Sequence, residues 1–152
     1  RAIRYSPNFA QGHYARGWTD VIAGRGDGAL HHIGTAIDLS PLDPFLYAMQ
    51  ATRAFAYLIA GDTARAALWA EHGARAPGAH YLIGMIAVAA HQMNGDDRRA
   101  AEWARHVRAT RPAASVERFF MAFPFADPAI RGKISEALAT AGMRDRGKGG
   151  RM

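Results

Sequence analysis

The sequence predicts an all-α fold in which antiparallel helix pairs repeat along the chain. Alanine is abundant and the 7 prolines are thinly spread, a composition that favours helices because alanine loses the least conformational entropy in them. Short motifs recur at one fixed interval along the chain. The pairs Gly61-Asp62 and Gly95-Asp96 are typical of a helix that ends on glycine and a next helix that is capped by aspartate.

The internal repeat is visible as residues that recur at a constant spacing. The matching positions, all separated by the same interval, are Ala2-Ile3 and Ala36-Ile37, Ser6-Pro7 and Ser40-Pro41, Gly61-Asp62 and Gly95-Asp96, Ala66 and Ala100, and Trp69 and Trp103. This interval is the tetratricopeptide period, a helix–turn–helix unit of about 34 residues. Three repeats are expected, at 10–43, 47–80 and 81–112, with three extra residues between the first two.

Small residues occupy the places in each repeat where two helices must approach closely. Counted from the start of the repeat, the eighth and twentieth places are expected to face each other at the helix crossing, where only small side chains fit. These places hold Gly17 and Ala29, Ala54 and Ala66, and Val88 and Ala100. Val88 is larger than the pattern prefers, so we expect the third pair to pack more loosely. The fifteenth place holds Gly24, Gly61 or Gly95, and we expect each of these glycines to end the first helix in a left-handed conformation.

Helix boundaries follow from the capping residues. The three pairs are expected at 8–23 and 26–39, 43–60 and 62–75, and 79–94 and 96–110. Asp43-Pro44 predicts an N-cap with proline in the first turn, and Asp62 and Asp96 predict caps directly after the turn glycine. Gly34 and Gly84 fall inside predicted helices, as does Gly12, and each costs roughly 0.5–1 kcal/mol relative to alanine.

Residues 113–142 lack the glycine and proline places of the repeat and are expected to form a C-terminal helical cap. Two helices are predicted, at 115–122 and 127–141, with Phe123-Pro124-Phe125 between them and Asp127-Pro128 starting the second. An apolar stripe at helical spacing indicates the face that covers the last repeat. It consists of Ile130, Ile134, Leu138 and Ala141.

The two ends of the chain differ from the repeats. Residues 1–7 match the end of a repeat's second helix, closed by Pro7, so we expect the chain to begin inside a repeat and to expose an apolar face there. An N-terminal neighbour, or a second copy of the chain in a homodimer, is expected to cover that face. Residues 143–152 are basic and rich in glycine, which predicts a disordered tail.

Composition restricts the classes of function. The formal charge is +6, but the arginines are scattered at helical spacing, which disfavours nucleic-acid binding. The chain has no cysteine and no visible signal peptide, so a cytoplasmic protein is expected. The longest apolar run, 81–90, is too short for a membrane span, which needs about 20 residues.

Motifs for catalysis, cofactors and metals are weak, and no such site is predicted. The glycine-rich segment 24–28 follows a helix and lacks the Lys-Ser/Thr pair of a phosphate-binding loop, so it is expected to be a turn between helices. His31 and His32 are adjacent, and their side chains diverge by about 100° on a helix. His72 and His106 share a repeat position but have no recurring carboxylate beside them.

Residues 1–112 resemble the tetratricopeptide repeat (TPR) superfamily, with three repeats and the remnant of a fourth. The segments 123–129 (FPFADPA), 139–143 (ATAGM) and 40–44 (SPLDP) resemble certain bacterial multidomain signalling proteins. In that family a class III adenylate/guanylate cyclase domain, or sometimes a winged-helix DNA-binding domain, lies upstream of such repeats. The resemblance implies a regulatory region and carries over no active site.

The same resemblance implies an inner, concave surface lined by the first helix of each repeat. The lining residues would be Gln11, Tyr14, Trp18, Val21, Ile22, Ala48, Ala51, Phe55, Leu58, Ile59, Leu82, Met85, Ala89, Gln92 and Met93. Such an apolar groove suits a protein partner, whereas the alternative is that many of these residues are core, covered by neighbouring helices or by the C-terminal cap. Lysine and asparagine are absent from these places, so an apolar helix or strand is a better ligand than an acidic C-terminal tail.

The sequence therefore predicts a non-catalytic protein-interaction or dimerisation module, as the regulatory part of a bacterial adenylate cyclase-like signalling protein. One alternative is the sensory or partner-binding half of a winged-helix transcription regulator. A second alternative is a helical domain whose groove holds a small hydrophobic ligand.

Overall fold

Helices make up the secondary structure of the chain. A computed structural model describes residues 9–39 and 46–143, and for 9–11 and 46–48 it describes the backbone alone. Within these ranges there are eight helices and no strand, so the all-α prediction is confirmed. The helices are α2 (Phe9–Ile22), α3 (Gly26–Leu39), α4 (Leu46–Ala60), α5 (Thr63–Arg75), α6 (Tyr81–Met93), α7 (Asp97–Thr110), α8 (Val116–Ala122) and α9 (Pro128–Thr140).

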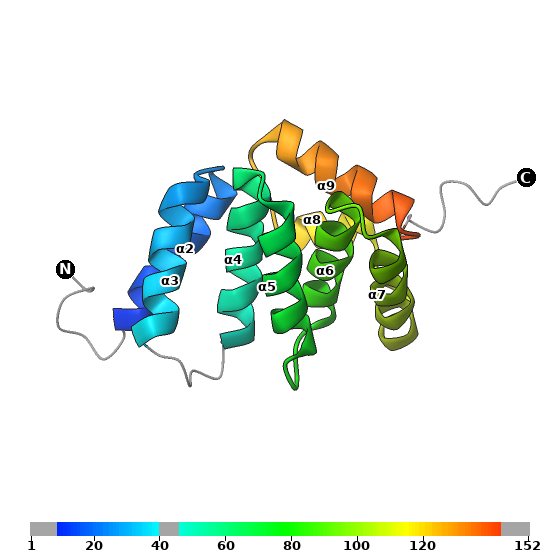
Figure 1. The fold of residues 1–152 in the computed structure, drawn as a ribbon, viewed down its shortest axis with the longest axis horizontal. Helices are drawn as coiled ribbons and strands as arrows, with labels where there is room; N and C mark the ends of the chain where they lie inside the picture. The colour runs from blue at the N-terminus through cyan, green and yellow to red at the C-terminus, as the bar shows by residue number, and fades with distance from the viewer. Residues whose placement is uncertain (1–8, 40–45, 144–152) are drawn as a thin grey trace, which may run out of the picture.

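Six of the helices lie side by side in chain order, and α9 crosses one end of the array (Figure 1). The closest contacts are within the pairs α2–α3, α4–α5 and α6–α7, and successive pairs meet through α3–α4 and α5–α6. Contacts of α4 with α2 and with α6 place the first helices of the pairs in one row. The predicted remnant at 1–7, the cap at Asp43-Pro44 and the tail beyond Met143 lie outside the described residues.

Glycine ends the first helix of every pair. Gly24, Gly61 and Gly95 have φ angles of 81°, 84° and 82°, a left-handed conformation that side chains with a Cβ rarely adopt. In each turn the next residue donates its backbone N–H to the carbonyl five residues earlier, as Asp62 does to Tyr57 at 2.9 Å. This bond pattern closes the helix ends and confirms the predicted glycine caps.

Aspartate begins three of the helices. The side chains of Asp62 and Asp96 each accept a hydrogen bond of 3.1 Å from the backbone N–H three residues later, as predicted. Asp127 accepts one of 2.9 Å from Ala129, with Pro128 in the first turn of α9. These carboxylates satisfy N–H groups that have no partner within the helix.

The small residues predicted at the helix crossings are buried. The alanines at these places, Ala29, Ala54, Ala66 and Ala100, are fully buried. A Cβ added at Gly17 would lie 2.6 Å from the side chain of Ile33. The absent side chain at Gly17 therefore makes room for a large residue of α3.

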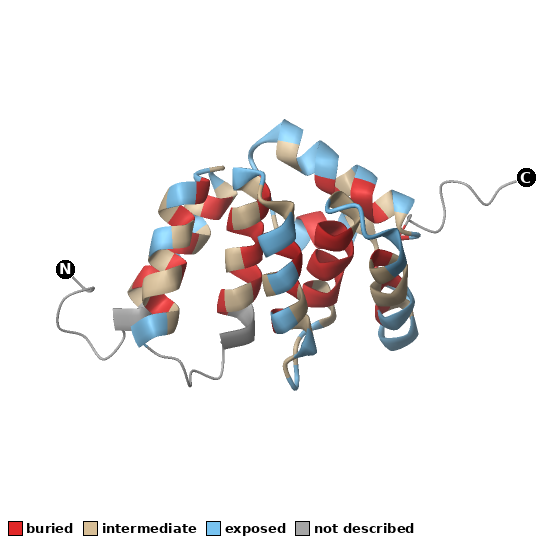
Figure 2. Cartoon of the chain, viewed as in Figure 1, coloured by how far each residue is buried: buried red, intermediate tan, exposed pale blue. Residues whose placement is uncertain are grey.

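The helix α6 is the most deeply buried element (Figure 2). Every residue from Ile83 to His91 is buried, because α6 packs against α4, α5, α7 and α9. The cap helix α9 contributes Ile134 and Leu138, which are both fully buried. No helix in the described part of the chain is long and apolar enough to cross a membrane.

Two helical glycines should respond oppositely to replacement by alanine. A Cβ at Gly34 would meet only a guanidinium nitrogen of Arg53, at 3.5 Å, whereas a Cβ at Gly84 would lie 2.8 Å from Cγ2 of the buried Val107. We expect Gly34→Ala to raise the free energy of unfolding by about 0.5–1 kcal/mol. Gly84→Ala should lower it by about 1–3 kcal/mol, because valine is rigid about χ1 and cannot move aside.

Urea unfolding of both variants, followed by circular dichroism, measures these changes. A stabilising Gly84→Ala would show that α6 and α7 are not packed as closely as described. The guanidinium of Arg53 lies 4.4 Å from the ring centre of Trp69. A destabilising Gly34→Ala would show that this stack needs the space that glycine leaves open.

Candidate functional site

The predicted groove residues are divided between core and surface. Six of them are at most 5% exposed: Val21, Ala51, Phe55, Leu58, Met85 and Ala89. Seven are partly exposed: Tyr14, Trp18, Ile22, Ile59, Leu82, Gln92 and Met93. The side chains of Gln11 and Ala48 lie outside the described part. Much of the predicted groove is therefore covered in this conformation.

An aromatic cluster from the C-terminal region covers the middle of the groove. Ring centres of Phe123 and Phe125 lie 4.9 and 5.0 Å from that of Phe55, and Phe119 lies 6.1 Å away, all edge-to-face. Phe123 also meets Trp18 edge-on at 5.7 Å. The alternative in which the cap fills the groove thus holds around Phe55, in an arrangement favoured by the quadrupoles of the rings.

Beside this cluster, part of the groove remains open as a pocket of about 370 Å³. Four helices and two connections form its wall. The lining residues are Tyr14 and Trp18 from α2, Ala51, Thr52 and Phe55 from α4, Leu82, Ile83 and Ile86 from α6, Ala122 from α8, and His80 and Phe123 from the connections. The volume lies in the range of small-ligand sites, roughly 300–1,000 Å³. The site is therefore large enough for two or three apolar side chains or one small molecule.

Three polar side chains lie in this otherwise apolar wall. The Thr52 hydroxyl donates to the Tyr14 hydroxyl at 3.5 Å. His80 caps α6, where its Nδ1 accepts the backbone N–H of Leu82 at 3.3 Å. In the neutral ring Nε2 then carries the proton and can donate a hydrogen bond. These groups can orient a ligand that is mainly apolar but carries a hydrogen-bond acceptor.

Sequence reasoning found part of this pocket. Tyr14, Trp18 and Leu82 were placed in the groove by their repeat positions and do line the pocket. Ile86 was missed, although its spacing of four residues from Leu82 would have found it. Phe123 was predicted as part of a break between helices and of the segment that resembles signalling proteins, but not as a lining residue. Nothing in the repeat pattern extends to the connection that carries it.

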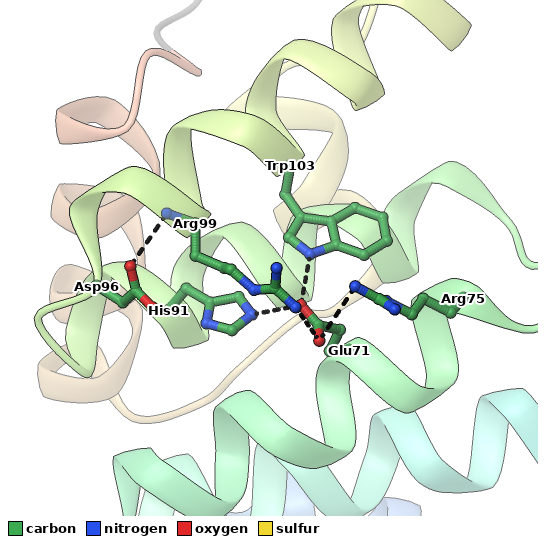
Figure 3. Close-up of polar contacts among 6 residues, drawn as sticks. All are labelled: Glu71, Arg75, His91, Asp96, Arg99 and Trp103. Atoms are coloured by element: carbon green, nitrogen blue, oxygen red, sulfur yellow. Dashed lines mark hydrogen bonds and ion pairs between the residues drawn. The ribbon is translucent and has the colours of Figure 1, made fainter.

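A second cluster, of polar groups, joins three helices around Glu71 (Figure 3). Oε1 of Glu71, on α5, accepts hydrogen bonds of 3.2 Å from Nε2 of His91 on α6 and from the indole N–H of Trp103 on α7. Oε2 pairs with Arg99 of α7, and Arg75 lies 3.6 Å away. One carboxylate thereby connects the second helix pair to both helices of the third.

The surroundings of Glu71 favour its ionised form. Burial alone would raise the pKa of Glu71, but the hydrogen bonds from Trp103 and Arg99 outweigh it and hold the pKa below its ordinary value. Conversely, the hydrogen bond and negative charge of Glu71 raise the pKa of Arg99. Glu71 and Arg99 therefore form a charged pair at neutral pH. The geometry of the cluster indicates that it holds α5, α6 and α7 together.

The histidines considered as metal ligands pack against other rings. Nδ1 of His13 and Nδ1 of His32 are 3.0 Å apart, so one ring donates to the other. Burial, followed by neighbouring positive groups, lowers the pKa of both rings. His72 and His106 each lie 5.5 Å from a tryptophan of their own helix. Among the described residues, no group of three or more His, Asp or Glu side chains is arranged to hold a metal ion.

Comparison with known proteins assigns no family to the chain. No family model matches it, and no curated protein shows significant similarity to it. The function must therefore be argued from the pocket and from the arrangement of the helices.

Replacing Glu71 with glutamine should lower the free energy of unfolding by about 1–3 kcal/mol at pH 7, because buried donors lose a charged acceptor. The pKa of Glu71 is lowered in the folded state. The contribution of Glu71 to the free energy of unfolding is therefore fully present above the ordinary glutamate pKa of about 4.3. It is lost as the pH falls through the pKa that Glu71 has in the folded state. Unfolding by urea between pH 3 and pH 7 should show a steeper loss of stability for the wild type than for Glu71→Gln.

Glu102 provides the matched control. It pairs with Arg98 on one face of α7, where the arginine side chain is 86% exposed. Glu102→Gln should change stability by no more than about 0.5 kcal/mol. If both glutamates gave equal effects, the cluster around Glu71 would have no special role in joining the helices.

Proposed function

We propose that the chain is a TPR-type protein-interaction module that binds an apolar segment of a partner in the pocket between α2, α4 and α6. Three lines of support are the recurrence of motifs at the tetratricopeptide period, the glycine that ends the first helix of each pair and the helices stacked in chain order. In such a module, the open pocket is the part of the inner surface of the repeats that the C-terminal region leaves uncovered.

The observation that carries the proposal is a pocket with partly exposed aromatic residues in its wall. Trp18 and Phe123 meet at its edge, and Leu82 extends the apolar wall along α6. Concave sites that are mostly apolar, with a few polar groups in the wall, are the usual places for ligands. Among the described residues that line the pocket there is no lysine or carboxylate, so an apolar segment fits it better than a charged tail.

The resemblance of the C-terminal segments suggests where such a module would act. We propose that it is the regulatory part of a bacterial adenylate cyclase-like signalling protein, and that a winged-helix regulator is the alternative parent. The coding sequence that precedes Arg1 distinguishes the two, since it would encode either a cyclase domain or a DNA-binding domain.

A small hydrophobic ligand is the second candidate, and the dimensions of the pocket favour it. A volume of about 370 Å³ with three polar groups suits a compact apolar molecule that carries an acceptor. Binding of such a molecule would raise the melting temperature in proportion to its concentration over its dissociation constant.

Selection of displayed random peptides against the immobilised chain tests the leading proposal. We expect enrichment of peptides with apolar residues and binding of one peptide per chain, measured by calorimetry. Trp18→Ala should weaken that binding at least tenfold, because the indole forms one wall of the pocket. Leu68→Ala serves as the control, since Leu68 is 53% exposed on α5 and does not line the pocket.

Peptides that bind equally well to the wild type and to Trp18→Ala would contradict the proposed site. Enrichment of acidic peptides would contradict the proposed chemistry. Saturable stabilisation by hydrophobic small molecules, without any selected peptide, would favour the second candidate.

A further inference from the structure

One segment of the chain already occupies the surface that the proposed function assigns to a partner. We call residues 122–126, which are the last residue of α8 and most of its connection to α9, the strap. Phe125 of the strap is buried and Phe123 is half-buried, and both rings meet the ring of Phe55 edge-on at 5.0 Å or less. The strap therefore lies on the groove and does not merely connect two helices.

The spacing of the two rings explains how the strap holds Phe55. Phe123 and Phe125 are two residues apart, with the exposed Pro124 between them. The backbone N–H of Phe125 donates to the carbonyl of Phe123 at 2.9 Å, which closes a tight turn around the proline. Both rings can thus reach one phenylalanine from a single turn of chain.

Few polar bonds tie the strap to the first helix pair. The backbone N–H of Ala126 donates to the carbonyl of Ile22 at 3.2 Å, at the end of α2. The ring contact with Trp18 is made by the half-buried Phe123. The open pocket begins at this same ring, since Phe123 and Ala122 form part of its wall. An incoming side chain can therefore contact Trp18 before the strap moves.

We propose that the strap is an internal competitor for the groove, and that the partner is a segment with two aromatic side chains two residues apart. The inference rests on the proposed function and specifies its ligand. The chemistry follows from what is seated there: Phe55 and Trp18 receive ring edges, and the adjoining pocket has space for further apolar groups. Because the strap is tethered, it competes at a high effective concentration and lowers the apparent affinity for the partner.

A peptide copied from the chain tests this proposal directly. The probe is the blocked peptide of residues 121–127, MAFPFAD, titrated by calorimetry into the full chain. We expect weak binding to the wild type and binding at least tenfold tighter to Phe123→Ala, because the substitution frees the ring site that the peptide fills. Met121→Ala is the control, since Met121 is 76% exposed on the adjacent helix α8 and should leave binding unchanged. A peptide with both phenylalanines replaced by alanine should not bind.

A reversible lock provides a second test that keeps both phenylalanines in place. The chain has no cysteine, so the double variant Ile22→Cys/Ala126→Cys would carry one possible disulfide, at the point where the strap is bonded to α2. The oxidised form should lose binding of the MAFPFAD peptide, and reduction should restore it. Equal binding to the wild type and Phe123→Ala, or undiminished binding to the oxidised form, would overturn the proposal.

The two proposals can fail separately. If displayed peptides of another chemistry bind the wild type and are weakened by Trp18→Ala, while MAFPFAD binds neither the wild type nor Phe123→Ala, the strap is not a competitor but the module still binds a partner. If neither kind of peptide binds, both proposals are wrong.

Discussion

The structure depends on the burial of one helix, α6, on all sides. Four helices surround it, so its residues from Ile83 to His91 lose contact with water together. A helix that is apolar around its whole circumference is stable only in such an environment. The one polar side chain in that buried stretch, His91, is satisfied by Glu71 of the preceding helix. The same contact that completes the core thus sets how the second pair sits on the third.

Local rules predicted most of the fold because the signals act within one helix or turn. A left-handed glycine followed by a capping aspartate, as at Gly61-Asp62, needs only residues within five positions of it. The cluster at Glu71 could not be predicted in this way. Its donors come from α6 and α7, up to 32 residues away, and they meet only once three helices are packed. The close approach of Ile33 to Gly17 could not be predicted for the same reason, since it depends on the rotation of α3.

The candidate site shows the same division. Tyr14, Trp18 and Leu82 were predicted together from their places in the repeat, which depend on the phase of single helices, and they line one pocket. Whether the inner surface is open or covered depends on where the connection after α8 runs. Phe123 and Phe125 come after the last repeat, so their positions cannot be predicted from the repeat pattern. The sequence therefore allowed either an open or a covered surface, and the contacts of these two rings show that the surface is covered around Phe55.

The rings between paired helices show that the pairs are not interchangeable parts. His13 and His32 hold the fourth and twenty-third places of the first repeat, and Gly84 and Trp103 hold the same places of the third. Two medium rings meet in one pair, while one large ring lies over a glycine in the other. A larger ring on one helix is thus accompanied by a smaller residue at the facing place of its partner helix, so that the space between them stays filled. A chimera that set α7 against α2 would bring an indole onto an imidazole. The second helices of the first and third pairs are therefore matched to their own first helices, and the residues between the helices restrict the order in which the pairs can be combined.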